Sequence, residues 1–284
     1  MSFKTLFTVA TSAQIDRPEA VLEVLDAAVS LARREDAHLE VLALGIDRTE
    51  IGYLYPGVSV GLYQQTLEAA QAEATRIADM VRARLGREDV RWSVDAAVTQ
   101  VGGIGALVAA RARFADLAVL PLPYGTGRGP AHEAVVEAVL FDADTPVLAL
   151  PDGMTDLAPF GRVVIGWNQG QEALAAIRAA IPILKQAGTV DIAVIDPTTH
   201  GPERSDPGGL LSQMLARHGI RAEVSVLART LPRISDVIAR HLRDRNADLL
   251  VMGAYGHSRL RQAILGGTTR NLLEGAQVPV FLAH

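Results

Sequence analysis

The residues with the clearest chemical potential lie in a glycine-containing segment near the C-terminus. The segment begins at Gly253, directly after the apolar run Leu249–Met252, and reads Gly-x-x-Gly, nine residues, then Gly-Gly-Thr-Thr. Glycines at the end of a strand permit positive φ angles and bring backbone N–H groups close to a phosphate. Gly266 and Gly267 stand where a helix is expected to begin, and the free N–H groups and dipole of a helix N-terminus favour an anion. The spacing therefore predicts a phosphate-binding loop.

The elements that must position this loop follow a regular alternation. Short β-branched or apolar runs alternate with longer amphipathic segments, which predicts βαβ crossovers and a mainly parallel sheet. Ligands of such sheets lie beyond the carboxyl ends of the strands, where the glycine loop is expected. The predicted strands lie near Thr5–Val9, Leu39–Leu44, Arg91–Ala97, Leu117–Leu120, Val147–Leu150, Val163–Trp167, Asp191–Ile195, Ala222–Leu227, Leu249–Met252 and Val280–Ala283. The predicted helices lie near Glu19–Arg34, Gln64–Leu85, Ile104–Arg113, Glu133–Phe141, Gln171–Gln186, Leu210–His218, Ile234–Arg245 and Thr269–Glu274.

An internal repeat divides the chain into two similar halves. Ala115–Leu120 resembles Ala247–Met252, 132 residues further on, and Thr145–Leu150 resembles Val278–Ala283, 133 residues further on. Two landmarks in the same order indicate tandem duplication. We expect one domain over residues 1–151 and a second over residues 161–284, joined by a segment with two prolines and two glycines. The predicted fold is two tandem open, mainly parallel-sheet α/β sandwiches.

Composition limits the function classes. The chain has 284 residues, is 49% hydrophobic and lacks cysteine, so a packed core is expected while disulfides and thiol nucleophiles are excluded. Its net charge of −5 has no compensating basic block, so nucleic acid is not an expected partner. No stretch is apolar enough for a membrane span or a signal peptide. The seven histidines show no metal-binding spacing. These features predict a cytoplasmic protein.

The glycine loop and its frame resemble the universal stress protein family, whose nucleotide-binding members carry Gly-x-x-Gly-x9-Gly-Ser/Thr at this place. The resemblance extends over the second half, from Val163–Asn168 to Val278–Val280. In the first half it is weaker and rests on Leu31–Arg34 and Asp144–Val147. It implies two universal stress protein domains in one chain, each with an adenine nucleotide alpha hydrolase-like, Rossmann-like fold.

The resemblance also implies an adenine-nucleotide site in the second half. ATP, alone or with Mg²⁺, is the implied ligand. Asn168 would lie near the adenine or ribose where the family usually has aspartate, and the backbone of Val194 would contact adenine. Gly267 replaces the family's Ser/Thr, which moves the hydroxyl to Thr268. The implied binding residues are Asn168, Val194, Gly253, Gly256, His257, Arg259, Gly266, Gly267 and Thr268. No catalytic residue and no metal ligand of the protein is expected.

The corresponding segment of the first half, Pro121–Pro130, departs from this pattern. The glycine spacing is lost, and prolines remove the amide hydrogens at 121, 123 and 130. Gly125-x-Gly127-x-Gly129 remains as an alternative anion-binding pattern, but a degenerate loop is the favoured interpretation. The first half is therefore expected to bind no nucleotide.

Three functions are consistent with these features. The leading one is a regulatory module of the stress response that binds an adenine nucleotide in its second half. A slow ATPase and a nucleotide-free dimerisation or scaffold protein are the alternatives. The absence of a Walker lysine and of paired carboxylates for magnesium predicts that any hydrolysis is slow. The resemblance further implies pairing through the last strand, Val280–Leu282, either between the two halves as an intramolecular pseudo-dimer or between chains as a homodimer.

Overall fold

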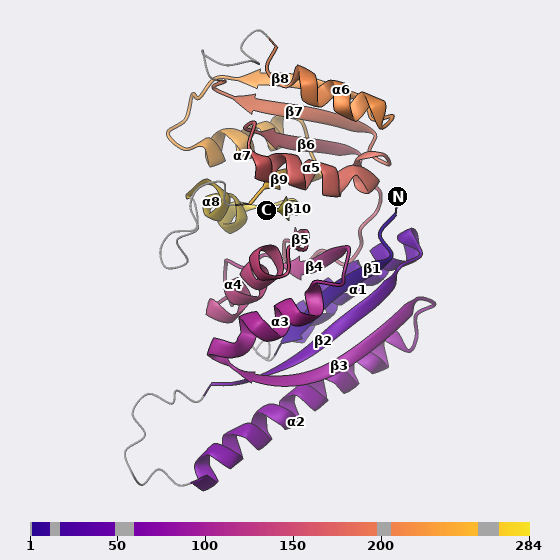
Figure 1. The fold of residues 1–284 in the computed structure, drawn as a ribbon, viewed down its shortest axis with the longest axis vertical. Helices are drawn as coiled ribbons and strands as arrows, with labels where there is room; N and C mark the ends of the chain where they lie inside the picture. Colours follow the sequence, from indigo (N-terminus) through magenta and orange to yellow (C-terminus); the bar gives the residue numbers. More distant parts are fainter. Residues whose placement is uncertain (1, 12–17, 49–59, 198–205, 255–266) are drawn as a thin grey trace. The chain divides into compact units, whose positions relative to one another are not determined.

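The structure, a computed structural model, describes residues 2–11, 18–48, 60–197, 206–254 and 267–284. The chain forms two units, each described here by itself. The N-terminal unit comprises Phe3–Thr145 and Asp152–Asp156. The C-terminal unit comprises Pro146–Pro151 and Leu157–His284. Each unit contains a sheet with helices packed against it (Figure 1).

The N-terminal unit contains a parallel sheet in the order β3-β2-β1-β4. Its strands are β1 (Thr5–Thr11), β2 (His38–Asp47), β3 (Arg91–Gln100) and β4 (Leu117–Pro121). Its helices are α1 (Pro18–Glu35), α2 (Val60–Leu85), α3 (Ile104–Ala112) and α4 (Pro130–Glu137), with the 3-10 turn η2 (Val101–Gly103) and the π-helical turn η3 (Ala138–Asp142). The predicted α/β alternation is confirmed in this unit.

The C-terminal unit contains a sheet in the order β5-β10-β9-β6-β7-β8. Its strands are β5 (Val147–Leu150), β6 (Arg162–Trp167), β7 (Thr189–Ile195), β8 (Ala222–Leu227), β9 (Leu249–Gly253) and β10 (Val280–Ala283). Its helices are α5 (Gln171–Leu184), α6 (Gly209–Arg217), α7 (Ile234–Asp244) and α8 (Gly267–Gly275). Every pair from β10 to β8 is parallel, and β5 pairs antiparallel with β10. The predicted open, mainly parallel architecture is confirmed here too.

Strand β1 of the N-terminal unit and strand β6 of the C-terminal unit begin with the same carboxylate contact. In the N-terminal unit, Asp116 Oδ2 accepts the N–H groups of Lys4 and Thr5 at 2.6 and 3.0 Å. In the C-terminal unit, Asp248 accepts the N–H groups of Gly161 and Arg162 at 2.7 and 3.0 Å. A carboxylate that accepts two backbone N–H groups fixes where a strand begins. Thr5 and Arg162 therefore occupy equivalent positions, which gives the two sheets a common register.

Strand β5 belongs to the C-terminal unit although it precedes the connecting segment in sequence. Leu148 lies opposite Phe281 in the antiparallel pair with β10, and all four residues of each strand are buried. The predicted strand Val147–Leu150 thus exists, but its neighbour at this edge is the last strand of the chain. This edge of the C-terminal sheet is therefore paired.

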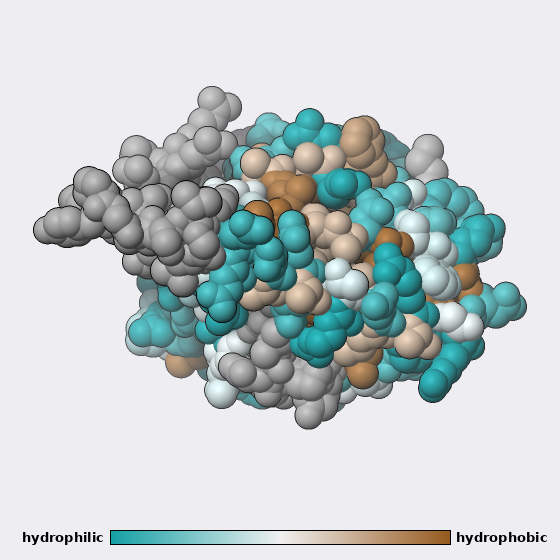
Figure 2. Space-filling view, turned by 90° about the horizontal axis from the view of Figure 1, so that it is seen from below, coloured by the Kyte–Doolittle hydropathy of each residue, from teal (hydrophilic) through white to brown (hydrophobic). Residues whose placement is uncertain are grey.

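The core consists of apolar side chains between the strands and their covering helices. In α1 the buried apolar positions follow the amphipathic pattern of the helix: Val21, Val24, Leu25, Ala27, Ala28, Val29, Leu31 and Ala32. Among the described helices none is both long enough and apolar enough to cross a bilayer. On the face shown in Figure 2, hydrophilic residues predominate and hydrophobic ones form small separate spots.

Candidate functional site

The carboxyl ends of β6, β7 and β9 meet at one edge of the C-terminal sheet. Trp167 at the end of β6 lies opposite Val194 of β7, and Gly166 lies opposite Met252 of β9. Asn168 and Gly253 are the next residues along their strands. The chain adds β7 and β8 on one side of β6 and then returns to add β9 and β10 on the other. Such a switch point is where open α/β sheets hold ligands.

The turn after β6 uses part of the Asn168 side chain. Asn168 Oδ1 accepts the N–H of Gly170 at 2.9 Å, which closes an Asx turn, and Gln169 between them has φ of 62°. Gly170 is the N-cap of α5. The Nδ2 donors of the exposed Asn168 make no hydrogen bond within the described part of the chain. Asparagine at this place therefore offers donors to a ligand, whereas an aspartate would offer acceptors.

Gly253 is required by packing. A Cβ at this position would lie 2.4 Å from the N atom of Ala173 and 2.6 Å from the carbonyl carbon of Glu172, both in the backbone at the start of α5. The sequence allowed a positive φ for a glycine at this strand end, but Gly253 does not adopt one. At Gly253 the absence of a side chain instead lets α5 approach the end of β9. Val194 is buried, and its backbone forms the neighbouring strand end.

The N-terminus of α8 is formed by Gly267 and Thr268, two of the predicted binding residues. Gly267 is exposed, and among the described residues a Cβ there would meet only Asn271 Nδ2, at 4.0 Å. The first described turn of α8 contains no acidic residue, so no carboxylate of this turn would compete with an anion there. The other predicted residues of the loop, Gly256, His257, Arg259 and Gly266, lie outside the described residues.

Trp167 is a candidate residue that the sequence analysis did not identify. Its side chain is 9% exposed, and its Nε1 donor is buried without a hydrogen-bond acceptor among the described residues. Buried indole N–H groups normally have a partner. An unpaired donor beside Asn168 and Val194 is consistent with a site that is completed by a ligand. A tryptophan directly before Asn168 at a strand end was the available sequence signal.

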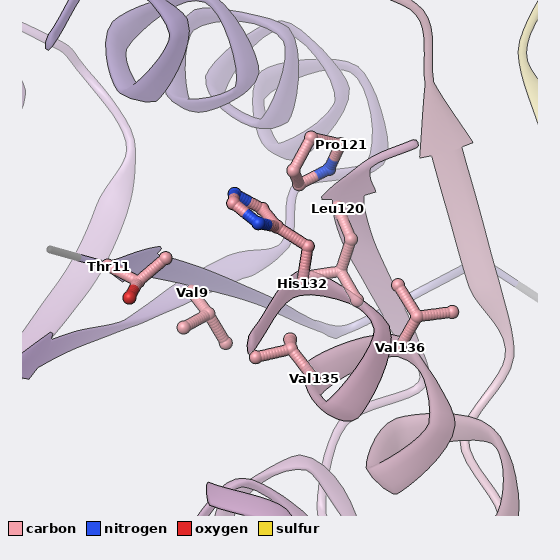
Figure 3. Close-up of a pocket in the computed structure, with 7 residues that line it drawn as sticks. All are labelled: Val9, Thr11, Leu120, Pro121, His132, Val135 and Val136. Atoms are coloured by element: carbon pink, nitrogen blue, oxygen red, sulfur yellow. The ribbon is translucent and has the colours of Figure 1, made fainter. Parts of the chain in front are cut away.

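The corresponding edge of the N-terminal unit is filled by side chains. The space between the ends of β1 and β4 and the start of α4 is a cavity of about 10 Å³, lined by Val9, Thr11, Leu120, Pro121, His132, Val135 and Val136 (Figure 3). That volume suits about one water molecule. Helix α4 begins at Pro130, a turn earlier than the predicted start at Glu133, because proline is well suited to the first helical position. This extra turn brings His132 to the cavity.

His132 is held as a neutral imidazole. Its Nδ1 accepts the N–H of Gly129 at 3.2 Å, so the proton of the neutral ring is on Nε2. The Nε2 atom is buried without an acceptor among the described residues. Burial, together with the positive charge of Arg128, lowers the pKa of His132 to about 4. The imidazole is therefore uncharged at neutral pH.

The segment between β4 and α4 does not form an open cradle. The residues from Pro121 to Tyr124 are all buried. Gly125 and Gly127 have positive φ angles of 120° and 75°, and the guanidinium of Arg128 pairs with Asp152 at 2.5 Å. Because its one arginine is already neutralised, this segment lacks an available cation for a phosphate.

Comparison with known sequences points to one family for the second half of the chain. Residues 159–284 match the model of the universal stress protein family. The curated protein "Universal stress protein Slr1230" of Synechocystis sp. is 33% identical over 90 residues. That match covers 32% of this chain and spans 30% of the length of the curated protein.

Comparison with solved structures extends over the whole chain. A universal stress protein from Archaeoglobus fulgidus DSM 4304 has a TM-score of 0.68 at 18% identity, with 98% of this chain and 95% of that chain covered. A protein from Pseudomonas aeruginosa UCBPP-PA14, described as a putative universal stress protein, has a TM-score of 0.56 at 14% identity, with 99% and 93% covered. At these identities the likeness establishes the fold alone.

Proposed function

We propose that this chain is a tandem universal stress protein that binds one adenine nucleotide, ATP, in its C-terminal unit and acts as a cytoplasmic regulatory module. The observation that carries the proposal is the edge formed by β6, β7 and β9. It combines a topological switch point, an unpaired buried indole N–H and a helix that begins with Gly267 and Thr268. The match of residues 159–284 to the family supports the same unit as the binding one.

Each described residue then has a definite role. The first-turn N–H groups of α8 and the hydroxyl of Thr268 would hold phosphate oxygens, with the helix dipole adding to the attraction. The Nδ2 donors of Asn168 and the Nε1 donor of Trp167 would bind acceptors of the ribose or base. The backbone of Val194 would contact adenine, and Gly256, His257, Arg259 and Gly266 would complete the phosphate loop. No described residue at this edge is placed to activate a water molecule, so we propose binding without efficient hydrolysis.

The N-terminal unit has a different role in this proposal. His132 and its apolar neighbours occupy the equivalent edge and leave about 10 Å³, far below the roughly 300 Å³ or more of a typical ligand pocket. We propose that this unit is the nucleotide-free half of an intramolecular pseudo-dimer.

The test is a calorimetric titration of the full chain with ATP, ADP and AMP, repeated with Gly267→Val. Valine at 267 places methyl groups where the phosphates would approach, while its Cβ meets only Asn271 Nδ2, at 4.0 Å, in the described part of the chain. We expect ATP affinity to fall at least about tenfold, the equivalent of roughly 1.4 kcal/mol. The free energy of unfolding should change little.

Gly275→Val is the matched control, because it lies in the same helix and has nothing within 4 Å of the added Cβ. Its ATP affinity should stay within about twofold of the parent. If both variants lowered ATP affinity equally, the nucleotide would not bind at the N-terminus of α8. The absence of saturable binding by any of the three nucleotides would favour the scaffold function instead.

A further inference from the structure

A second cavity of the N-terminal unit lies on the sheet face beside α3. Its volume is about 490 Å³, which is within the range of small-molecule pockets, roughly 300–1,000 Å³. Phe7 and Leu42 are buried apolar lining residues, and Glu40, Asp95, Arg111 and Phe114 contribute charges and an aromatic ring. All of these residues belong to one unit and are described by the structure.

The charges of this cavity do not balance. Arg111 pairs with Asp95 at 2.6 Å, so these two side chains neutralise each other. Glu40 is half-buried and makes no ion pair or hydrogen bond with any side chain that the structure describes. One negative charge is thus left without a counter-charge. The ionised form of a partly buried carboxylate is stabilised by a cation that contacts it directly, because a hydrogen bond between two charged groups is stronger than one between neutral groups.

The C-terminal unit shows how the equivalent carboxylate is satisfied. The common register pairs Phe7 with Glu40 in one unit and Val164 with Asp191 in the other, so Glu40 and Asp191 are equivalent. Asp191 Oδ2 lies 2.7 Å from His241 Nε2 and 3.0 Å from Arg245 Nε. Asp191 and His241 are 9% and 8% exposed, so this cluster fills the space beside α7.

The N-terminal unit lacks both of these partner side chains. Counted back from the shared aspartates Asp116 and Asp248, the position of His241 corresponds to Ala109 and that of Arg245 to Arg113. Ala109 has no polar group, and Arg113 Nε instead donates to the carbonyl oxygen of Ala109 at 3.3 Å. The cavity therefore lies where the other unit places the side chains of His241 and Arg245.

We propose that this cavity binds a small organic cation, a primary ammonium or a guanidinium on a short apolar stem. The cationic group contacts the Glu40 carboxylate, and the stem packs on Phe7 and Leu42. The ring of Phe114, which is 75% exposed, closes over the cation and contributes a cation–π contact. A bound cation of this type would contact Glu40 as the side chains of His241 and Arg245 contact Asp191 in the C-terminal unit. The inference is independent of nucleotide binding.

The test is a titration of the full chain with phenethylammonium and butylguanidinium, followed through the backbone amide resonances of Ser93, Asp95 and Ala110. Both cations should bind saturably at one site. The neutral analogue 2-phenylethanol, which keeps the ring and loses the charge, should bind at least about tenfold more weakly. Equal affinity for the neutral analogue, or no saturable shift with either cation, overturns the proposal.

Variants locate the cation within the cavity. Glu40→Gln keeps the shape and removes the charge, and should weaken both cations at least about tenfold. Phe114→Leu keeps apolar area without the ring and should weaken binding by about threefold or more. Ala109→His copies the C-terminal unit and should abolish binding. Asp89→Asn, an exposed carboxylate elsewhere in this unit, is the matched control and should leave affinity unchanged. Unchanged affinity in Glu40→Gln contradicts the proposal.

Discussion

At the scale of single residues, the two units carry side chains with different properties at corresponding places in their sheets. Asp191 is neutralised by side chains of its own unit, whereas its equivalent Glu40 is not. Trp167 keeps an unpaired buried donor at the strand ends of the C-terminal unit, while His132 fills the corresponding edge of the N-terminal unit. Fold similarity between the units therefore does not carry over to their sites.

His132 makes the stability of the N-terminal unit depend on pH in a defined direction. Its pKa is about 4 in the folded protein, against 6.5 for a free side chain. Above pH 6.5 both states are neutral and the unit has its full stability. As the pH falls from 6.5 toward 4, the unfolded chain takes up a proton that the folded one excludes, so stability falls by up to about 3 kcal/mol. The charged groups that act on the ring are Arg128 and Asp152.

The variant His132→Asn tests this dependence. The Asn side-chain oxygen can still accept the N–H of Gly129, but the residue does not titrate. Between pH 7 and pH 4, the free energy of unfolding measured with denaturant should fall less in the variant than in the parent. The difference between the two losses should reach about 3 kcal/mol at pH 4. His218→Asn, at an exposed position, should keep the parent's slope. If the free energy of unfolding changed with pH identically in His132→Asn and in the parent, His132 would not be the cause of the pH dependence.

At the scale of elements, close approaches between strands and helices fix the candidate site. The end of β9 touches the start of α5 at Gly253, and this contact sets the place from which the glycine loop departs. Because β9 and α5 come this close, position 253 requires a glycine even though its φ angle is not positive. A glycine can thus match a phosphate-loop spacing and still be required by packing.

Gly253→Ala tests the packing requirement. The added methyl group would lie 2.4 Å from Ala173 N and 2.6 Å from the Glu172 carbonyl carbon, so β9 and α5 must move apart. We expect the free energy of unfolding of the C-terminal unit to fall by about 2–3 kcal/mol in chemical denaturation. Gly267→Ala, where the space is open, should change it by less than about 0.5 kcal/mol. Equal stability of the two variants would show that the approach at Gly253 is not required.

At the scale of the whole molecule, the α/β architecture could be predicted from the sequence because its strands and helices have clear periods. Every predicted strand and helix is present, with ends that differ by a few residues, as at α4, where Pro130 begins the helix earlier than Glu133. The placement of β5 beside β10 could not be read from local pattern, because pairing between distant strands depends on packing.

The candidate site could be predicted only in outline. Strand order brings Asn168, Val194 and Gly253, three of the binding residues implied by the family resemblance, to one edge. The unpaired indole of Trp167 and the filling of the other edge by His132 depend on side-chain burial, which motif spacing does not encode. The uncompensated charge of Glu40 depends on which residue lies opposite Phe7 across the sheet and on the side chains around it, and neither can be read from the local sequence pattern.

The central claim is that the two units differ in nucleotide binding, and the number of nucleotides bound per chain tests it most directly. Equilibrium dialysis of the full chain against labelled ATP at saturating concentration gives this number without dependence on binding heat. We predict one ATP per chain, bound in the C-terminal unit. Two ATP molecules per chain, or one that Gly267→Val does not affect, would contradict it.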